Sequence, residues 1–169
     1  VVAEALELAG QLVRPGVTTR EIDRRIETLI RDRGGVPSFL GYHDYPAATC
    51  ISVNEQVVHG IPGDRALEEG DIVGVDVGVF LHGFHGDAAR TFAVGAIDEE
   101  AERLLRVAEA ALSCGITAIR AGCRVGAISH AIQTSVEAQG FSVVRDLVGH
   151  GVGRKLHEDP QVPNFGPVE

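Results

Sequence analysis

The chain has 169 residues, of which 44% are hydrophobic and 23% are charged. That is the size and composition of one ordinary globular domain, which excludes a disordered or collagen-like chain. Lys and Arg number 15 and Asp and Glu number 24, so the net charge is −9. This charge argues against nucleic acid or an anionic membrane as a partner and suits cations instead. Because the sequence contains no Met, Val1 is not an unprocessed translation start, and we expect a processed chain or part of a longer one.

The cysteines and the apolar segments indicate the compartment. Cys50, Cys114 and Cys123 form no CxxC pair, so neither a disulfide framework nor a zinc finger is indicated. No apolar run approaches the ~20 residues that span a bilayer, and the N-terminus lacks the basic and apolar regions of a signal peptide. We therefore expect a cytoplasmic protein with free thiols and no membrane contact.

The first strong pattern is an amphipathic helix that follows a helix-like segment at residues 3–13. Thr18 and Glu21 have the spacing of a capping box, and Gly34 ends the helix. Apolar residues recur at helical spacing between these signals, at Ile22, Ile26, Leu29 and Ile30.

The same pattern occurs again 106 residues later, behind a second helix-like segment at residues 99–119. The offset carries Arg14 onto Arg120, Gly16 onto Gly122, Ile22 onto Ile128, Ile26 onto Ile132, Ile30 onto Val136 and Gly34 onto Gly140. Two amphipathic helices can be similar by chance, but the coinciding Arg-x-Gly turns favour a duplication. We expect a first unit at 1–97 and a second unit at 98–169. The second unit ends before its last strands, so the symmetry predicts a missing C-terminal segment of roughly 30 residues.

Residues 71–95 have the pattern of a β-hairpin. Four valines alternate from Val73 to Val79, a His82-Gly83 turn follows, and a second extended run comes after it. Asp76 and Asp87 then lie opposite each other or one diagonal step apart, on the same face and roughly 5–8 Å from each other.

Two carboxylates on an apolar hairpin repel each other, so they need a proton, a basic partner or a metal ion. In the structural alternative, one aspartate ends a strand or pairs with Arg90. Glycines at Gly78, Gly83 and Gly86 favour the metal, because they would open space for an ion beside the hairpin. Carboxylate oxygens with one imidazole would suit Mn, Fe, Co or Zn.

Three histidines stand in contexts that favour a site. His150 lies between two glycines in the segment GHGVG, which indicates close backbone approach and favours a ligand over a structural histidine. His157 follows in HEDP, and His59 lies in VNEQVVHGIP. Either of these two could equally be a solvated loop histidine.

Four segments of the chain, in order and with the right spacing, resemble the signature blocks of the type I methionine aminopeptidases. The blocks are FLGYHDYPAATCISVNEQVVHGIPGD, GDIVGVDVGV, GFHGDAARTF and GHGVGRKLHEDPQVPN. The resemblance covers nearly the whole chain and implies the α+β "pita-bread" fold of creatinase and aminopeptidases. In that fold, pseudo-twofold duplicated helix-helix-strand units surround an antiparallel sheet. The chain would then be a single metallopeptidase domain, 1–169, with its second unit truncated.

The resemblance also implies the ligands of the metal site. Asp76, Asp87 and His150 match ligands of two divalent ions, which could be Co, Mn, Fe or Zn. The ions would activate a water molecule and polarise the scissile carbonyl. Two further glutamates complete the family's site, one of them also as general base, and both lie beyond Glu169 in the family pattern. We therefore expect this chain alone to be inactive.

Further residues match substrate contacts of the family. His59 resembles the residue that orients the substrate amide and assists the departing amine, and His157 the one that hydrogen-bonds the carbonyl as it becomes tetrahedral. Tyr42, Tyr45 and Cys50 match positions that line the pocket for the methionine side chain, to which an aromatic and sulfur lining is suited.

The function implied is hydrolysis of the initiator methionine from nascent polypeptides with a small second residue. The partners would be nascent N-termini at the ribosome, bound by a monomer without direct nucleic-acid contact. A Xaa-Pro aminopeptidase or prolidase is the alternative with the same fold, and the Tyr42 and His59 blocks argue against it. A non-catalytic binding protein with this fold is the other alternative, against which the retained ligands argue. Phe39 and Leu156 depart from the residues common in the family and leave the pocket's shape open.

Overall fold

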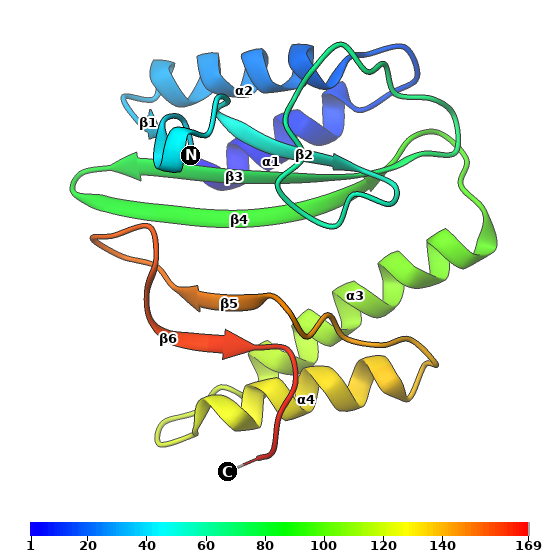
Figure 1. Ribbon diagram of the computed structural model, residues 1–169, viewed down its shortest axis with the longest axis vertical. Coiled ribbons are helices and arrows are strands. Elements are labelled where there is room, and N and C mark those ends of the chain that lie inside the picture. The colour runs from blue at the N-terminus through cyan, green and yellow to red at the C-terminus, as the bar shows by residue number, and fades with distance from the viewer. Residues whose placement is uncertain (169) are drawn as a thin grey trace. The chain divides into compact units, whose positions relative to one another are not determined.

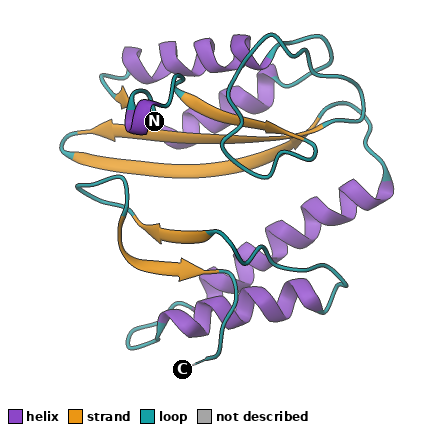
Figure 2. Cartoon of the chain, viewed as in Figure 1, coloured by secondary structure: helices purple, strands orange, loops and turns teal. Residues whose placement is uncertain are grey.

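The computed structural model describes residues 1–168 and divides into two compact units, which are described separately. Unit 1 consists of Val1–Asp98 together with Val152–Leu156, and unit 2 of Glu99–Gly151 together with residues 157–168. Figure 1 shows the elements of each unit, and Figure 2 shows the loops that join them. None of the helices in residues 1–168 is long and apolar enough to cross a membrane.

Unit 1 is a sheet with helices on one face. Its elements in chain order are α1 (Val2–Leu12), α2 (Thr19–Asp32), β1 (Val36–Pro37), the 3-10 turn η1 (Tyr42–Asp44), β2 (Thr49–Val53), β3 (Ile72–Leu81) and β4 (Phe84–Ala93). β3 pairs antiparallel with the other three strands: with β1 near its C-terminal end, with β2 along its first half and with β4 along its whole length. Because β2 and β4 pair with the same residues of β3, they lie on its two opposite edges.

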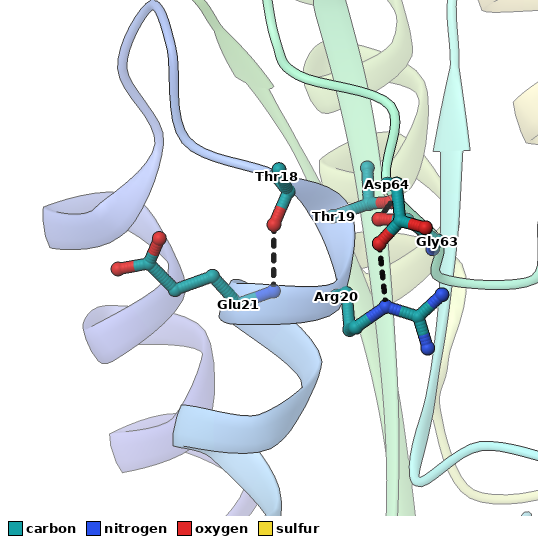
Figure 3. A network of polar contacts seen from close by, with 6 residues as sticks. All are labelled: Thr18, Thr19, Arg20, Glu21, Gly63 and Asp64. Atoms are coloured by element: carbon teal, nitrogen blue, oxygen red, sulfur yellow. Dashed lines mark hydrogen bonds and ion pairs between the residues drawn. The ribbon is translucent and has the colours of Figure 1, made fainter.

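The start of α2 confirms the predicted cap and ties the helix to a distant loop. Thr18 is the N-cap, and its hydroxyl accepts a hydrogen bond from the backbone N–H of Glu21 at 3.2 Å (Figure 3). In the same first turn, Arg20 Nε donates to Asp64 Oδ1 at 2.8 Å, and the Thr19 hydroxyl accepts from the backbone N–H of Gly63 at 2.9 Å. The helix start therefore holds the loop that runs between β2 and β3.

The core of unit 1 lies between the helices and one face of the sheet. From β3 and β2 it receives the side chains of alternate residues, Val73, Val75, Val77, Val79, Ile51 and Val53. From the helices it receives Ala5, Ala9, Ile22, Ile26 and Ile30, all fully buried. This burial follows from the period of two in a strand and of 3.6 in a helix. The opposite face of β3 carries Gly74, Asp76 and Gly78.

Unit 2 repeats the helix pair of unit 1 at the predicted offset. Its elements are α3 (Glu99–Ala118), α4 (Val125–Glu137), β5 (Val148–Gly151) and β6 (Glu158–Pro163), and the two strands pair antiparallel. Moving α2 by 106 residues places its first residue on the first residue of α4. The turn glycines also match, since φ is +85° at Gly16 and +81° at Gly122, and +76° at Gly34 and +77° at Gly140. The same offset does not carry β1 and β2 onto β5 and β6.

Candidate active site

The hairpin brings the two aspartates together, as the sequence predicts. Leu81 pairs with Phe84, so His82 and Gly83 form a two-residue turn, and both have the positive φ that a type I′ turn requires. In this register Asp76 lies opposite Ala89, while Asp87 lies opposite Gly78. Asp76 and Asp87 are therefore diagonal neighbours on the sheet face that the helices of unit 1 leave open.

The surroundings of Asp76 favour the neutral acid when no cation is present. Burial, the charge of the adjacent Asp87 and a hydrogen bond with it together raise the pKa of Asp76 to about 7. A divalent cation between the two carboxylates would offset their repulsion, and carboxylate oxygens are ligands for divalent metal ions. The carboxylate pair thus fits a metal ion, although neither unit of the described chain gathers three or more His, Cys, Asp or Glu side chains at one point.

On the other edge of β3, Cys50 lies directly opposite Asp76. Burial raises the pKa of the Cys50 thiol to about 11, and the nearby charges of Asp76 and Asp87 act in the same direction. A hydrogen bond with the Tyr45 hydroxyl acts the other way. At neutral pH the group is therefore an uncharged thiol, a better apolar lining than a metal ligand.

Tyr45 reaches over the start of β2. Its hydroxyl lies 3.0 Å from the carbonyl oxygen of Thr49 and 2.9 Å from that of Gly60, and its pKa is raised, chiefly by burial. Thr49 is held in turn from the helix side, where Asp23 Oδ1 accepts from its backbone N–H at 2.8 Å and from its hydroxyl at 2.7 Å. Both α2 and Tyr45 therefore hold the start of β2, where Cys50 lies.

The predicted role of the hairpin glycines is wrong at two positions. A Cβ built at Gly78 would lie 2.5 Å from the ring of Phe39, so that ring, and no open space, occupies the position beside Asp87. Gly86 points to the helix side, where a Cβ would lie 3.3 Å from Val2. Gly83 serves the turn, with φ +86°. At Gly78 and Gly86 the absence of a side chain leaves room for Phe39 and Val2. At Gly83 it permits the positive φ of the turn.

A Ser–His contact that the sequence did not reveal holds the segment of Phe39 in place. Ser38 Oγ lies 2.8 Å from His85 Nδ1, and the backbone N–H of Ser38 donates to the carbonyl of Gly78 at 2.9 Å. His85 precedes Asp87 by two residues on the same face of β4 and packs against Phe80 with ring centroids 4.8 Å apart. Because 47 residues separate the two side chains in the chain, no local pattern could have indicated the contact.

Tyr42 and His59 lie in exposed loops of unit 1. Tyr42 begins η1, is 39% exposed and meets the ring of His43 edge-on. His59 lies in the loop between β2 and β3 and has the left-handed φ of +58°, which is uncommon outside glycine. Its neighbour Gly60 is buried against β2, and the backbone N–H of Ile51 donates to its carbonyl at 2.8 Å. The predicted roles of both residues stay predictions.

The other two of the three predicted site histidines lie together in unit 2. The rings of His150, on β5, and His157, just before β6, have centroids 4.1 Å apart. His150 Nδ1 lies 2.8 Å from the carbonyl oxygen of Gly151. A carbonyl only accepts, so Nδ1 carries the proton in this contact, as it does in a metal-binding histidine that donates from Nδ1 to the backbone and binds the ion through Nε2.

Comparison with known proteins places the chain in a family. The sequence profile of metallopeptidase family M24 matches residues 1–169. A methionine aminopeptidase of Clostridium perfringens is 56% identical over 166 residues, which is 98% of this chain and 67% of that protein. The chain thus spans about two thirds of the length of this relative. Family M24 also implies metal ions as the cofactor.

Solved structures agree in fold. The methionine aminopeptidase of Thermotoga maritima superposes with a TM-score of 0.96 at 48% identity, over 98% of this chain and 67% of that one. The prolidase of Pyrococcus furiosus, at 23% identity, superposes with a TM-score of 0.85 over 97% of this chain and 48% of that one, which shows the shared fold alone. The expected α+β pita-bread fold is confirmed, and the chain belongs to the methionine aminopeptidases of metallopeptidase family M24.

Proposed function

We propose that the protein containing this chain removes the initiator methionine from new polypeptides whose second residue is small. The observation that carries the proposal is the Asp76–Asp87 pair on the sheet face opposite the helices of unit 1, with the neutral thiol of Cys50 directly beside it on β2. The two carboxylates are suited to metal ions. The Cys50 thiol and the Tyr45 ring are suited to the thioether of a methionine side chain. Relatives at 48–56% identity carry the name methionine aminopeptidase, which supports the same activity here.

The metal ligands proposed are Asp76 and Asp87 of unit 1 and His150 of unit 2, for two divalent ions of Co, Mn, Fe or Zn. When bound, such ions polarise the scissile carbonyl and supply an activated water. The repulsion between the two carboxylates, which raises the pKa of Asp76, supports a cation at this place. The Nδ1 proton of His150 is held by the Gly151 carbonyl, which supports ligation through Nε2.

The substrate contacts proposed are Tyr42, Tyr45 and Cys50 for the methionine side chain, and His59 and His157 for the peptide. Cys50 offers an apolar sulfur surface because its thiol stays protonated well above neutral pH. Phe39 lies over Gly78 beside Asp87 and would narrow the same pocket. A histidine near the carbonyl would stabilise charge as it develops on the oxygen. The proposed partners are nascent N-termini at the ribosome, met by a cytoplasmic monomer.

The test compares two substrates for the product of the complete open reading frame, loaded with Mn²⁺ or Co²⁺. We expect release of methionine from Met-Ala-Ser and no turnover of Xaa-Pro peptides. Turnover of the Xaa-Pro peptides alone would contradict the proposal and favour a prolidase-like activity. Binding of peptide without turnover of either substrate would favour the non-catalytic alternative. The Asp76→Asn variant serves as the inactive control.

A further inference from the structure

Gly60, the residue that follows His59, attaches this part of the loop to β2. Residues 54–59 are all exposed, whereas Gly60 is buried. A Cβ built at Gly60 would lie 2.2 Å from the carbonyl oxygen of Ile51, so the loop backbone lies directly on the backbone of β2 at this point. No side chain larger than hydrogen can occupy that contact without moving one of the two backbones.

Two side-chain hydroxyls complete this attachment. The Gly60 N–H donates to Ser52 Oγ at 3.1 Å, and the Tyr45 hydroxyl lies 2.9 Å from the Gly60 carbonyl oxygen. Ser52 pairs with Gly74 on β3, which places its side chain on the same sheet face as Asp76. Ser52 is buried, and the function proposed above gives it no role.

The attachment fixes the backbone of the residue that precedes it. His59 has φ +58°, a conformation that costs a non-glycine residue free energy and persists only where the surroundings enforce it. Gly60 supplies that enforcement through three hydrogen bonds, to Ile51, Ser52 and Tyr45. Since Ile51 adjoins Cys50, which pairs with Asp76, the anchor lies about two strand spacings, roughly 10 Å, from Asp76.

We infer that Ser52 and the Tyr45 hydroxyl are positioning residues that hold His59 in its left-handed conformation beside β2. The inference rests on the proposed function, in which His59 acts on the substrate. Tyr45 then has two separable parts: its ring belongs to the side-chain pocket, and its hydroxyl belongs to the Gly60 anchor.

The kinetic test uses Ser52→Ala and Tyr45→Phe in the metal-loaded product of the complete open reading frame, with Met-Ala-Ser as substrate. Because misplacement of a reacting group lowers the rate more than the binding, we expect kcat to fall about tenfold while KM stays within about threefold. Ser52→Thr keeps the hydroxyl and should restore kcat to within about twofold. In a His59→Ala background, Ser52→Ala should cause no further loss, since its effect acts through His59.

Thr19→Val is the matched control. It removes a hydroxyl that accepts from Gly63, in the same loop but beyond His59 (Figure 3), and should leave kcat within about twofold. An equal fall in kcat for Thr19→Val, or additive losses for Ser52→Ala and His59→Ala, would overturn the inference.

A second readout separates this inference from the proposed function. Amide hydrogen exchange at Ile51 and Gly60 requires no activity, and Ser52→Ala should accelerate it about tenfold or more at both sites. Failure of the wild-type protein to cleave Met-Ala-Ser would contradict the proposed function alone. Unchanged amide exchange in Ser52→Ala would contradict the inference that Ser52 holds Gly60, whatever the activity.

Discussion

The isoleucines of α2 and the residues at the same places in α4 are buried to very different extents. Ile22, Ile26 and Ile30 are fully buried beneath the sheet of unit 1. Their counterparts at the 106-residue offset, Ile128, Ile132 and Val136, are only half-buried in unit 2. The two helices begin at equivalent positions and follow equivalent glycine turns, so their local structure does not explain the difference.

The difference lies in what each helix pair packs against. In unit 1 four strands cover the apolar face, whereas in unit 2 an open cleft of about 280 Å³ remains along α3 and α4. Its lining is mostly apolar and includes Leu104, Val107, Leu112, Ile132, Val136 and Phe141. Local pattern thus decides where a helix forms, but the burial that stabilises it comes from the sheet. The further strands that the symmetry predicts for unit 2 stay a prediction.

The largest expected effect is on the free energy of unfolding, when equivalent isoleucines of α2 and α4 are each replaced by alanine. Ile26→Ala removes a fully buried side chain between α2 and the sheet and should lower the free energy of unfolding by about 2–5 kcal/mol. Ile132→Ala removes a half-buried side chain beside an existing cleft, so its cost should be less than about half of that. Urea denaturation followed by amide exchange in each unit measures both. Equal costs would contradict the comparison.

The next effect tests how tightly the sheet face of unit 1 is packed around Asp87. Gly78→Ala would place a Cβ 2.5 Å from the Phe39 ring and should cost about 1–3 kcal/mol of stability. Gly74→Ala, on the same strand and face, meets its nearest atom at 3.7 Å and should be nearly neutral. Thermal unfolding of the two variants measures the difference, and the double variant Gly78→Ala/Phe39→Leu should recover part of the loss. A neutral Gly78→Ala would mean that Phe39 does not occupy this position.

A smaller effect should be the same in both units. Gly16 and Gly122 are the third residues of equivalent turns, with φ +85° and +81°, so an alanine at either place would cost about 1 kcal/mol. Nothing lies within 4 Å of a Cβ at either position, so the conformation alone sets the cost. Urea denaturation of the two variants should show equal shifts. Clearly unequal shifts would contradict the view that the turns match and only the cores differ.

The smallest expected effect concerns the carboxylate of Asp23, buried between α2 and β2. Burial raises its pKa above the ordinary value of 3.8, while hydrogen bonds from Thr49 partly offset this. The folded state therefore favours the protonated form, and the folding stability that Asp23 contributes is greatest below pH 3.8 and declines as pH rises through the folded-state pKa. Asp23→Asn keeps an acceptor for Thr49 without the charge. Its stability relative to wild type should rise between pH 3 and pH 6, and a fall across that interval would contradict the sign.

The sequence was sufficient for features that depend on neighbouring residues. The Thr18 cap, the His82-Gly83 turn and the alternation that places Asp76 and Asp87 on one face all follow from local rules, and the structure has them. The contacts that shape the site are not local. Ser38 meets His85 across 47 residues, and Asp23 meets Thr49 across 26. The sequence predicted open space for an ion at Gly78, because no pattern in it reveals that the Phe39 ring packs there.

The central claim is that the carboxylate pair of unit 1 is a metal site. Calorimetric titration of Mn²⁺ into the product of the complete open reading frame tests it most directly, with Asp76→Asn and Asp87→Asn as variants of nearly unchanged shape. The account predicts Mn²⁺ binding by the wild-type protein and at least about tenfold weaker binding by each variant. Equal affinities in all three proteins would contradict it.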